Sequence, residues 1–230
     1  YTAAGNLNIT TGATTFIVRV LSQRTLLQPK DEDFRAVAVI NERKNRLTIN
    51  NFILGSSFSF TKNNQINLLD EDFSQVRFKV EWAGNLLNTL LRLSGQEKNE
   101  NGAYGFLGLE PSQFIKTEIN YIKHWRVGRE RVMAFRSFVG VALPYGNANN
   151  IPFTRSYFAG GSNDNRAWKA YKLGPGRSVL LNEFNEANFK IALNLEYRFP
   201  VFGNFKGALF MDAGNIWNVL DNVEDPAQRF

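Results

Sequence analysis

The sequence predicts an all-β protein, namely a segment of a transmembrane antiparallel β-barrel with about seven strands in this chain of 230 residues. Three observations lead to this prediction. Apolar and polar residues alternate over long stretches, aromatic residues gather near the ends of those stretches, and short turns follow long connections. No run of apolar residues approaches the ~20 that a transmembrane helix needs, whereas a barrel strand needs an apolar residue only at every second position.

The alternation is clearest in Asn188–Phe199, where every odd position is apolar and the even positions include Lys190, Glu196 and Arg198. One side of this strand therefore suits lipid and the other suits water. Several predicted strands have ten residues or more, whereas strands of globular proteins centre on ~5–6 residues. Besides Asn188–Phe199, the predicted strands are Gln75–Trp82, Phe114–Val127, Met133–Leu143 and Phe205–Ala213, with weaker candidates at Thr15–Leu21, Phe34–Ile40 and Leu47–Thr61.

Aromatic side chains near the strand ends favour a membrane barrel over a large soluble β domain, which alternates in the same way. They lie where the interfacial girdles of a barrel occur. These residues are Trp82, Trp125, Tyr197, Phe199 and Trp217. On this pattern alone the soluble β domain stays open as the alternative.

The connections predict which strand ends share a side of the membrane. Gly128–Glu130 and Pro200–Asn204 are expected to be tight periplasmic turns, because outer-membrane barrels have short turns on one side and long loops on the other. Lys62–Asp72 is a longer periplasmic connection, and Asn85–Leu93 is either a short helix or an extension of a strand. The extracellular connections are then Ser22–Arg46, Leu93–Ser112 and Pro144–Ala187.

The strand count bears on the domain organisation. We expect residues 1–230 to form part of one barrel domain, with residues 144–187 as its extracellular and lumen loop. About seven strands cannot close a bacterial barrel, which needs at least about eight and an even number. An open sheet would leave unpaired backbone groups in lipid. The remaining strands are therefore expected from chain outside this sequence or from a partner.

Composition excludes several kinds of chemistry. The chain has no Cys and one His, and its 27 basic and 21 acidic residues give a net charge of +6. No cofactor, metal site or nucleic-acid partner is expected, because phosphate-loop motifs and stacking platforms are absent and the runs Asp31–Asp33 and Asp70–Asp72 suit solvated loops. A barrel hydrolase is one alternative, with His124 and, on the adjacent strand, Ser137 as a conceivable nucleophile. The sequence lacks a G-x-S-x-G nucleophile elbow, so no catalytic residue is predicted.

Three motifs in order carry the functional signal. The long loop contains AGGS at Ala159–Ser162, then RAW at Arg166–Trp168 and LGPG at Leu173–Gly176. Two strands follow, one ending in LEYRFP at Leu195–Pro200 and one containing MDAGNIW at Met211–Trp217. This part of the sequence resembles the BamA/TamA superfamily of outer-membrane assembly and translocation proteins. Its motifs are most similar to those of the lipoprotein-type TamA relatives known as TamL.

The resemblance implies a loop folded into the barrel lumen, with a motif of the form [V/I]-R-G-[F/Y/W] at its tip. Acidic residues on the next two strands hold the arginine of that motif. The sequence departs from the motif at Asn165, in place of an aliphatic residue, and at Ala167, in place of Gly. Carried over to this chain, the motif residues are Gly160, Gly161, Ser162, Asn165, Arg166, Ala167 and Trp168, and their partners are Glu196 and Asp212.

The alternation supports these partners independently of the resemblance. Glu196 and Asp212 both occupy even, polar positions on consecutive strands, so they can be neighbours that face the lumen. A guanidinium can pair bidentately with a carboxylate there. Asp212 is the first choice, because it lies in mid-strand. In the alternative interpretation, Arg166 is one of the solvated charges of the loop, with Lys169, Lys172 and Arg177.

The resemblance further implies a non-enzymatic factor that assists insertion or translocation of other proteins at the outer membrane of a Gram-negative bacterium. Its partners would be the lipid bilayer, unfolded or nascent outer-membrane proteins, and accessory periplasmic or lipoprotein subunits. Periplasmic POTRA repeats and the final strands, expected of the family, are not in this chain. A passive porin or uptake channel and the barrel hydrolase are the alternative functions.

Overall fold

The computed structural model describes residues 52–99, 104–105, 111–146, 148, 150–178, 185–219 and 226–230, together with Val37. The chain divides into the units Tyr1–Thr48 and Ile49–Phe230, and the fold described below belongs to the second. Within the described residues, no helix has the length and apolar character needed to cross a membrane.

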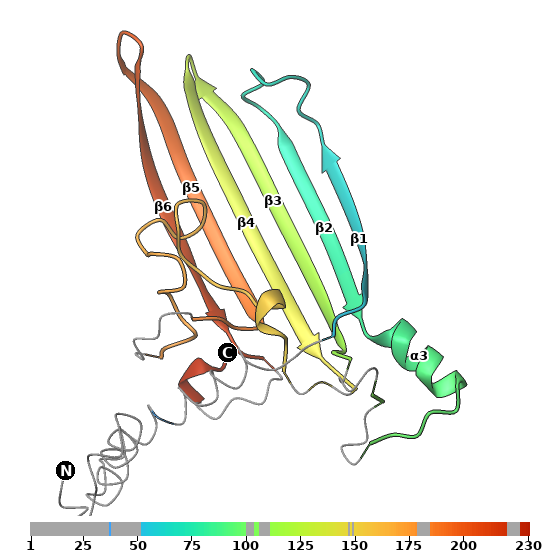
Figure 1. The fold of residues 1–230 in the computed structure, drawn as a ribbon. Coiled ribbons are helices and arrows are strands. Elements are labelled where there is room, and N and C mark those ends of the chain that lie inside the picture. Colours follow the sequence, from blue (N-terminus) through green and yellow to red (C-terminus); the bar gives the residue numbers. More distant parts are fainter. Residues whose placement is uncertain are drawn as a thin grey trace, which may run out of the picture. The chain divides into compact units, whose positions relative to one another are not determined.

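The second unit contains one antiparallel sheet of six strands, each paired with its neighbour in the sequence (Figure 1). This arrangement confirms the predicted all-β fold. The remaining elements are the helix α3 (Asn85–Leu93) between β2 and β3, and the short 3-10 helices η3 (Phe153–Arg155) and η4 (Pro226–Gln228). The strands are β1 (Gly55–Asn63), β2 (Ser74–Ala83), β3 (Phe114–Gly128), β4 (Arg131–Pro144), β5 (Phe189–Phe202) and β6 (Phe205–Trp217).

Six of the predicted strands correspond to β1–β6. The candidates Thr15–Leu21 and Phe34–Ile40 lie outside the described residues, apart from Val37, and so does the beginning of Leu47–Thr61. Asn85–Leu93 is a helix, which decides between the two options that its sequence left open.

The turn predicted at Pro200–Asn204 is wrong in extent. Strand β5 continues to Phe202, and only Gly203 and Asn204 form the turn, with Gly203 at φ 52°. The register shifts between Pro200 and Phe202, and an irregularity of this kind tolerates a proline that cannot donate to the ladder.

The register divides the sheet into two faces. Even positions of β3–β6 share one face with odd positions of β1 and β2, because side chains alternate and paired residues point the same way. This face carries most of the charges. A ladder of Cα partners in its middle runs through Arg77, Asn120, Phe138 and Ala192 to Gly214.

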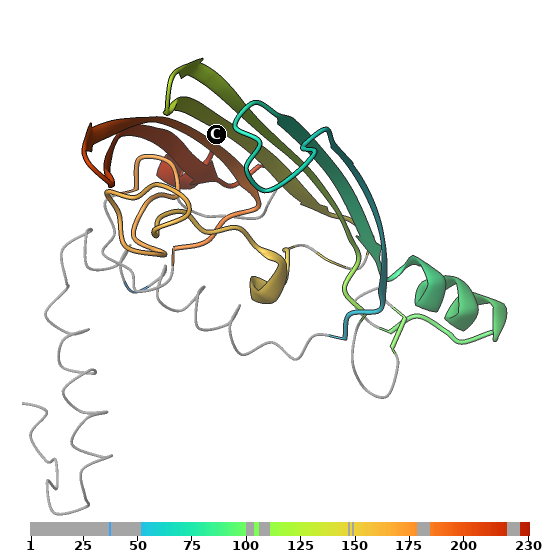
Figure 2. The same cartoon turned by 90° about the horizontal axis from the view of Figure 1, so that it is seen from above.

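The opposite face is apolar and exposed. Phe58, Leu193 and Leu209 are 56%, 40% and 67% exposed, although a water-facing sheet would bury such residues in a core. The sheet is curved, and the connection between β4 and β5 lies on its concave side (Figure 2). The apolar convex face is the lipid-facing side of a transmembrane barrel segment, and the charged concave face lines its interior.

The buried core lies where the β4–β5 loop meets one end of the sheet. Phe114 and Ile216 are fully buried there against the loop residues Ile151, Tyr157 and Ala159. A β-barrel wall one layer thick has no second sheet to pack against, so the loop supplies the second layer of this core.

The division into two faces predicts different effects for lysine at two positions of β1, one on each face. Phe60 lies on the convex face and Ser57 on the concave face, opposite Glu81. Phe60→Lys should lower the free energy of unfolding of the full-length protein by ~2–4 kcal/mol, because a charge enters the lipid. Ser57→Lys should change it little. Guanidinium titration of both variants in lipid vesicles measures this, and equal losses would contradict the assignment of faces.

Candidate functional site

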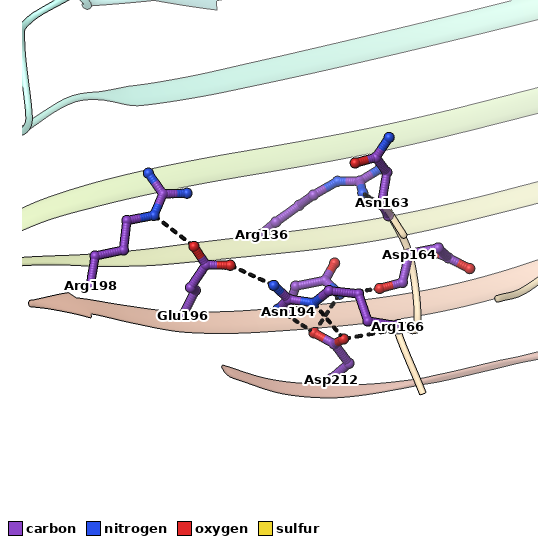
Figure 3. A network of polar contacts seen from close by, with 8 residues as sticks. All are labelled: Arg136, Asn163, Asp164, Arg166, Asn194, Glu196, Arg198 and Asp212. Carbon is purple, nitrogen blue, oxygen red and sulfur yellow. Dashed lines mark hydrogen bonds and ion pairs between the residues drawn. The ribbon is translucent and has the colours of Figure 1, made fainter. Parts of the chain in front are cut away.

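Arg166, from the β4–β5 loop, lies between two carboxylates of the sheet (Figure 3). Its Nε and Nη2 donate to Oδ2 and Oδ1 of Asp212, each at 2.8 Å, and its backbone N–H donates to Asp212 Oδ2 at 3.0 Å. Its Nη1 donates to Glu196. The parallel pair of hydrogen bonds to Asp212 is the strong, directional form of an arginine–carboxylate contact. The structure thus brings together the three charged residues of the predicted site.

Asp212 is the principal partner because it is the more buried carboxylate. Its side chain is 6% exposed, against 20% for that of Glu196. Asn194, the Cα partner of Asp212 across β5 and β6, donates from Nδ2 to Asp212 Oδ1 at 2.9 Å. Glu196 lies two residues further along β5 and also accepts from Arg198 Nε at 2.6 Å. Asp212 therefore depends most on Arg166, while Glu196 has a second cation.

The surroundings of Arg166 keep it charged. The hydrogen bonds from its guanidinium to Asp212, followed by those to Glu196, raise the pKa of Arg166 above its usual value despite partial burial. The ring of Phe210 lies under the guanidinium, with the ring centroid 3.9 Å from Cζ. Phe210 shares the concave face with Asp212, so strand β6 supplies both a carboxylate and a cation–π surface.

Two glycines shape the loop that presents Arg166. Gly160 and Gly161 have φ of 99° and 105°, a region that residues with a Cβ rarely adopt. The N–H of Gly160 donates to Asp164 Oδ2 at 2.8 Å, and the N–H of Gly161 donates to the carbonyl of Trp168 at 2.8 Å. A Cβ on Gly160 would lie 2.3 Å from the carbonyl oxygen of Lys169. These contacts close the loop into the turn whose tip holds Arg166.

The other predicted motif residues differ in burial. Asn165 is 5% exposed and packs on β6, where a Cβ on Gly214 would lie 3.0 Å from its Oδ1. Ser162, Ala167 and Trp168 are exposed, and the structure does not place them in the contact with Asp212 and Glu196. Asn165, a departure from the family motif, is therefore buried against the wall next to Arg166 in the sequence.

Sequence reasoning missed a second set of contacts between the loop and the wall. Lys190 Nζ forms an ion pair with Asp164 at 3.0 Å and donates to the carbonyl of Phe158 at 2.7 Å. Arg136 Nη1 donates to the carbonyl of Asn163 at 2.7 Å. Asn194 Nδ2 also donates to the carbonyl of Asp164 at 2.7 Å. These wall residues all occupy even positions, so the alternation was a signal that could have identified them.

The loop is also fixed nearer the end of the sheet, around Tyr157. Lys116 Nζ donates to the carbonyl of Arg155 at 2.8 Å and lies 4.2 Å from the centroid of the Tyr157 ring. The ring lies over Gly140 of β4, where an added Cβ would be 2.6 Å from the phenol carbon and oxygen. A glycine at this position of the strand therefore makes room for the tyrosine.

Strand geometry contradicts the pairing of His124 with Ser137 that the hydrolase alternative uses. His124 lies on the concave face, opposite Ala134, and its ring packs 4.4 Å from that of Phe73. Ser137 occupies an odd position of β4 and so lies on the convex face. The predicted nucleophile and base are on opposite sides of the sheet. Across the described residues, no group of three or more acidic or histidine side chains is arranged to hold a metal ion.

An open cavity of about 430 Å³ is lined by residues of the loop tip and of strands β3–β5. Polar side chains dominate its lining, with His124, Arg136 and Arg198 on the wall and Asn163 and Arg166 on the loop. The concave face is thus a charged surface against which the loop is held by discrete contacts.

These features define a segment of an outer-membrane β-barrel with an inward-folded loop. A family model described as the Omp85 superfamily domain matches residues 17–228. The chain belongs to the Omp85 superfamily, which includes the BamA/TamA proteins and serves outer-membrane protein assembly and translocation. A search of curated proteins gives no match to the chain.

The fit between Tyr157 and Gly140 predicts a selective effect on the loop. Gly140→Ala should displace the tyrosine ring and raise the rate of proteolysis between residues 155 and 177, because overpacking a filled site costs ~1–3 kcal/mol. Gly128→Ala is the matched control on the same hairpin, since its added Cβ would meet only the Arg131 side chain at 3.5 Å. Limited proteolysis of folded protein in detergent compares them, and equal rates for Gly140→Ala and wild type would contradict the described packing.

Proposed function

We propose that this chain forms part of the barrel of a non-enzymatic factor that inserts or translocates other proteins at the outer membrane of a Gram-negative bacterium. Within the superfamily it is most similar to the lipoprotein-type TamA relatives. The observation that carries the proposal is the attachment of Arg166, at the tip of the inward loop, to Asp212 and Glu196.

The attachment supports an assembly role because it keeps a defined loop surface against the barrel wall. Residues 144–187 act in this proposal as the lumen loop, and β1–β6 act as the rigid wall that holds it. Unfolded or nascent outer-membrane proteins pair with an exposed strand edge of the complete barrel by β-augmentation. Accessory periplasmic or lipoprotein subunits deliver them. No step of this process forms or breaks a covalent bond, so the loop contributes shape and rigidity instead of catalytic groups.

Loss of Arg166 should impair assembly while the barrel persists. Arg166→Ala leaves Asp212 partly desolvated without its guanidinium, at a local cost of ~1–3 kcal/mol, so the loop should loosen. Arg166→Lys should rescue poorly, because an ammonium cannot reproduce the planar bidentate contact. Asp212→Asn should resemble Arg166→Ala. The measurement is assembly of client barrels by the full-length protein in vesicles, with heat-modifiable gel mobility as the control for an intact barrel.

Arg177→Ala is the matched control, because Arg177 is an exposed arginine of the same loop, and it should retain wild-type activity. Wild-type client assembly in all of the Arg166 and Asp212 variants would remove the arginine from the mechanism. Ion conductance by the complete barrel, with no change in client assembly when the protein is depleted, would instead identify a passive channel.

A further inference from the structure

Helix α3 carries an exposed stripe of leucines. Leu86, Leu90 and Leu93 are 61%, 53% and 78% exposed. Their spacing of four and three residues places them along one side of the helix. Leu87 and Leu91, on the adjacent side, are buried at 7% and 8%. The helix therefore uses one pair of leucines to pack and presents three others outward.

The base of α3 is fixed to the end of the sheet. Gly84, with φ of 81°, precedes the helix and donates its N–H to the carbonyl of Leu54 at 2.9 Å. Asn85 Oδ1 accepts from Tyr145 Oη at 2.8 Å and from Gln113 Nε2 at 3.4 Å. A Cβ on Gly84 would lie 2.5 Å from the Gln113 side chain. These contacts tie the start of the helix to the residues just before β1, just before β3 and just after β4.

The lipid-facing side of the sheet continues toward this helix. Trp82, the penultimate residue of β2, is 38% exposed on the convex face, and Ile115, at the start of β3, is 40% exposed there. Leu54, which directly precedes β1, is also 40% exposed. Trp82 suits the boundary between the hydrocarbon and the headgroups. The leucine stripe begins four residues after it, at the same end of the sheet.

Figure 2 shows that α3 extends outward past β1 and β2, away from the concave space that holds the β4–β5 loop. Nine helical residues span ~13 Å, enough to reach over the lipids next to the barrel wall. Arg92, in the last turn, is exposed and lies off the leucine stripe. A cation beside an apolar stripe suits a surface of anionic headgroups above acyl chains.

We propose that α3 is an interfacial helix, with Leu86, Leu90 and Leu93 in contact with the lipid acyl chains of the outer leaflet beside β1–β3. Continuity with the lipid-facing side of the sheet selects lipid as the occupant. This assignment rests on the barrel fold and not on the proposed assembly function. It adds a lipid contact outside the barrel wall, on the extracellular side.

The absence of Cys from this chain permits a direct test with single labels. Leu90→Cys and Leu93→Cys, labelled with bimane in the full-length protein, are reconstituted into phosphatidylcholine and phosphatidylglycerol vesicles with brominated acyl chains. Any cysteine elsewhere in the full-length protein is first replaced. Arg92→Cys is the matched control off the stripe. Bromine should reduce the emission at positions 90 and 93 by about half and leave that at position 92 nearly unchanged, because only the stripe reaches the acyl chains.

Two results would overturn the proposal. Equal quenching by brominated lipid at positions 90 and 92 would show that the stripe has no preference for acyl chains. Quenching of the label at position 90 by aqueous iodide would assign the stripe to solvent. Protection of that label from quenching that grows with the density of protein in the vesicle would assign the stripe to a second copy of the protein. The triple variant Leu86→Asn, Leu90→Asn, Leu93→Asn should retain the heat-modifiable mobility of the barrel, because these exposed leucines are outside its buried core.

Discussion

The bidentate contact between Arg166 and Asp212 holds the β4–β5 loop against the barrel wall. It joins a loop to a strand 46 residues further along the chain, and both partners are drawn partly out of water. A desolvated carboxylate without its cation is costly, so the contact stabilises one arrangement of the loop more than it adds to the overall stability of the barrel. Its energetic role is therefore conformational specificity.

The contact constrains residues over a wide area. The β5–β6 register must set Asn194 beside Asp212, and Gly160 and Gly161 must turn the loop so that Arg166 points at β6. Phe210 must occupy the same face as Asp212. A second set of cations, Lys116, Arg136 and Lys190, donates to loop carbonyls further along the wall. The loop is thus held at several points, with the arginine at its tip.

Much of the fold was predictable from the alternation of apolar and polar residues, because a sheet one layer thick between lipid and water needs strict alternation. The shared face of Glu196 and Asp212 followed from the same argument. Other features depend on tertiary contacts that no local pattern encodes. Tyr157 over Gly140 requires the path of the loop, and the extension of β5 through Pro200 requires the register shift against β6. Phe210 and Lys190 were at predictable even positions but lacked a distinguishing motif. The pairing of Ser137 with His124 was wrong, because the alternation places an odd position of β4 and an even position of β3 on opposite faces.

Hydrogen exchange in the β4–β5 loop measures how strongly the contact between Arg166 and Asp212 holds the loop. Protection of the Gly160, Gly161 and Trp168 amides, which donate within the loop, reports the free energy of loop opening in the full-length protein. A double-mutant cycle of Arg166→Ala and Asp212→Ala should give a coupling energy of ~1–3 kcal/mol, because either single change already breaks the contact. Additive effects of the two substitutions, or unchanged protection in all three variants, would contradict the account.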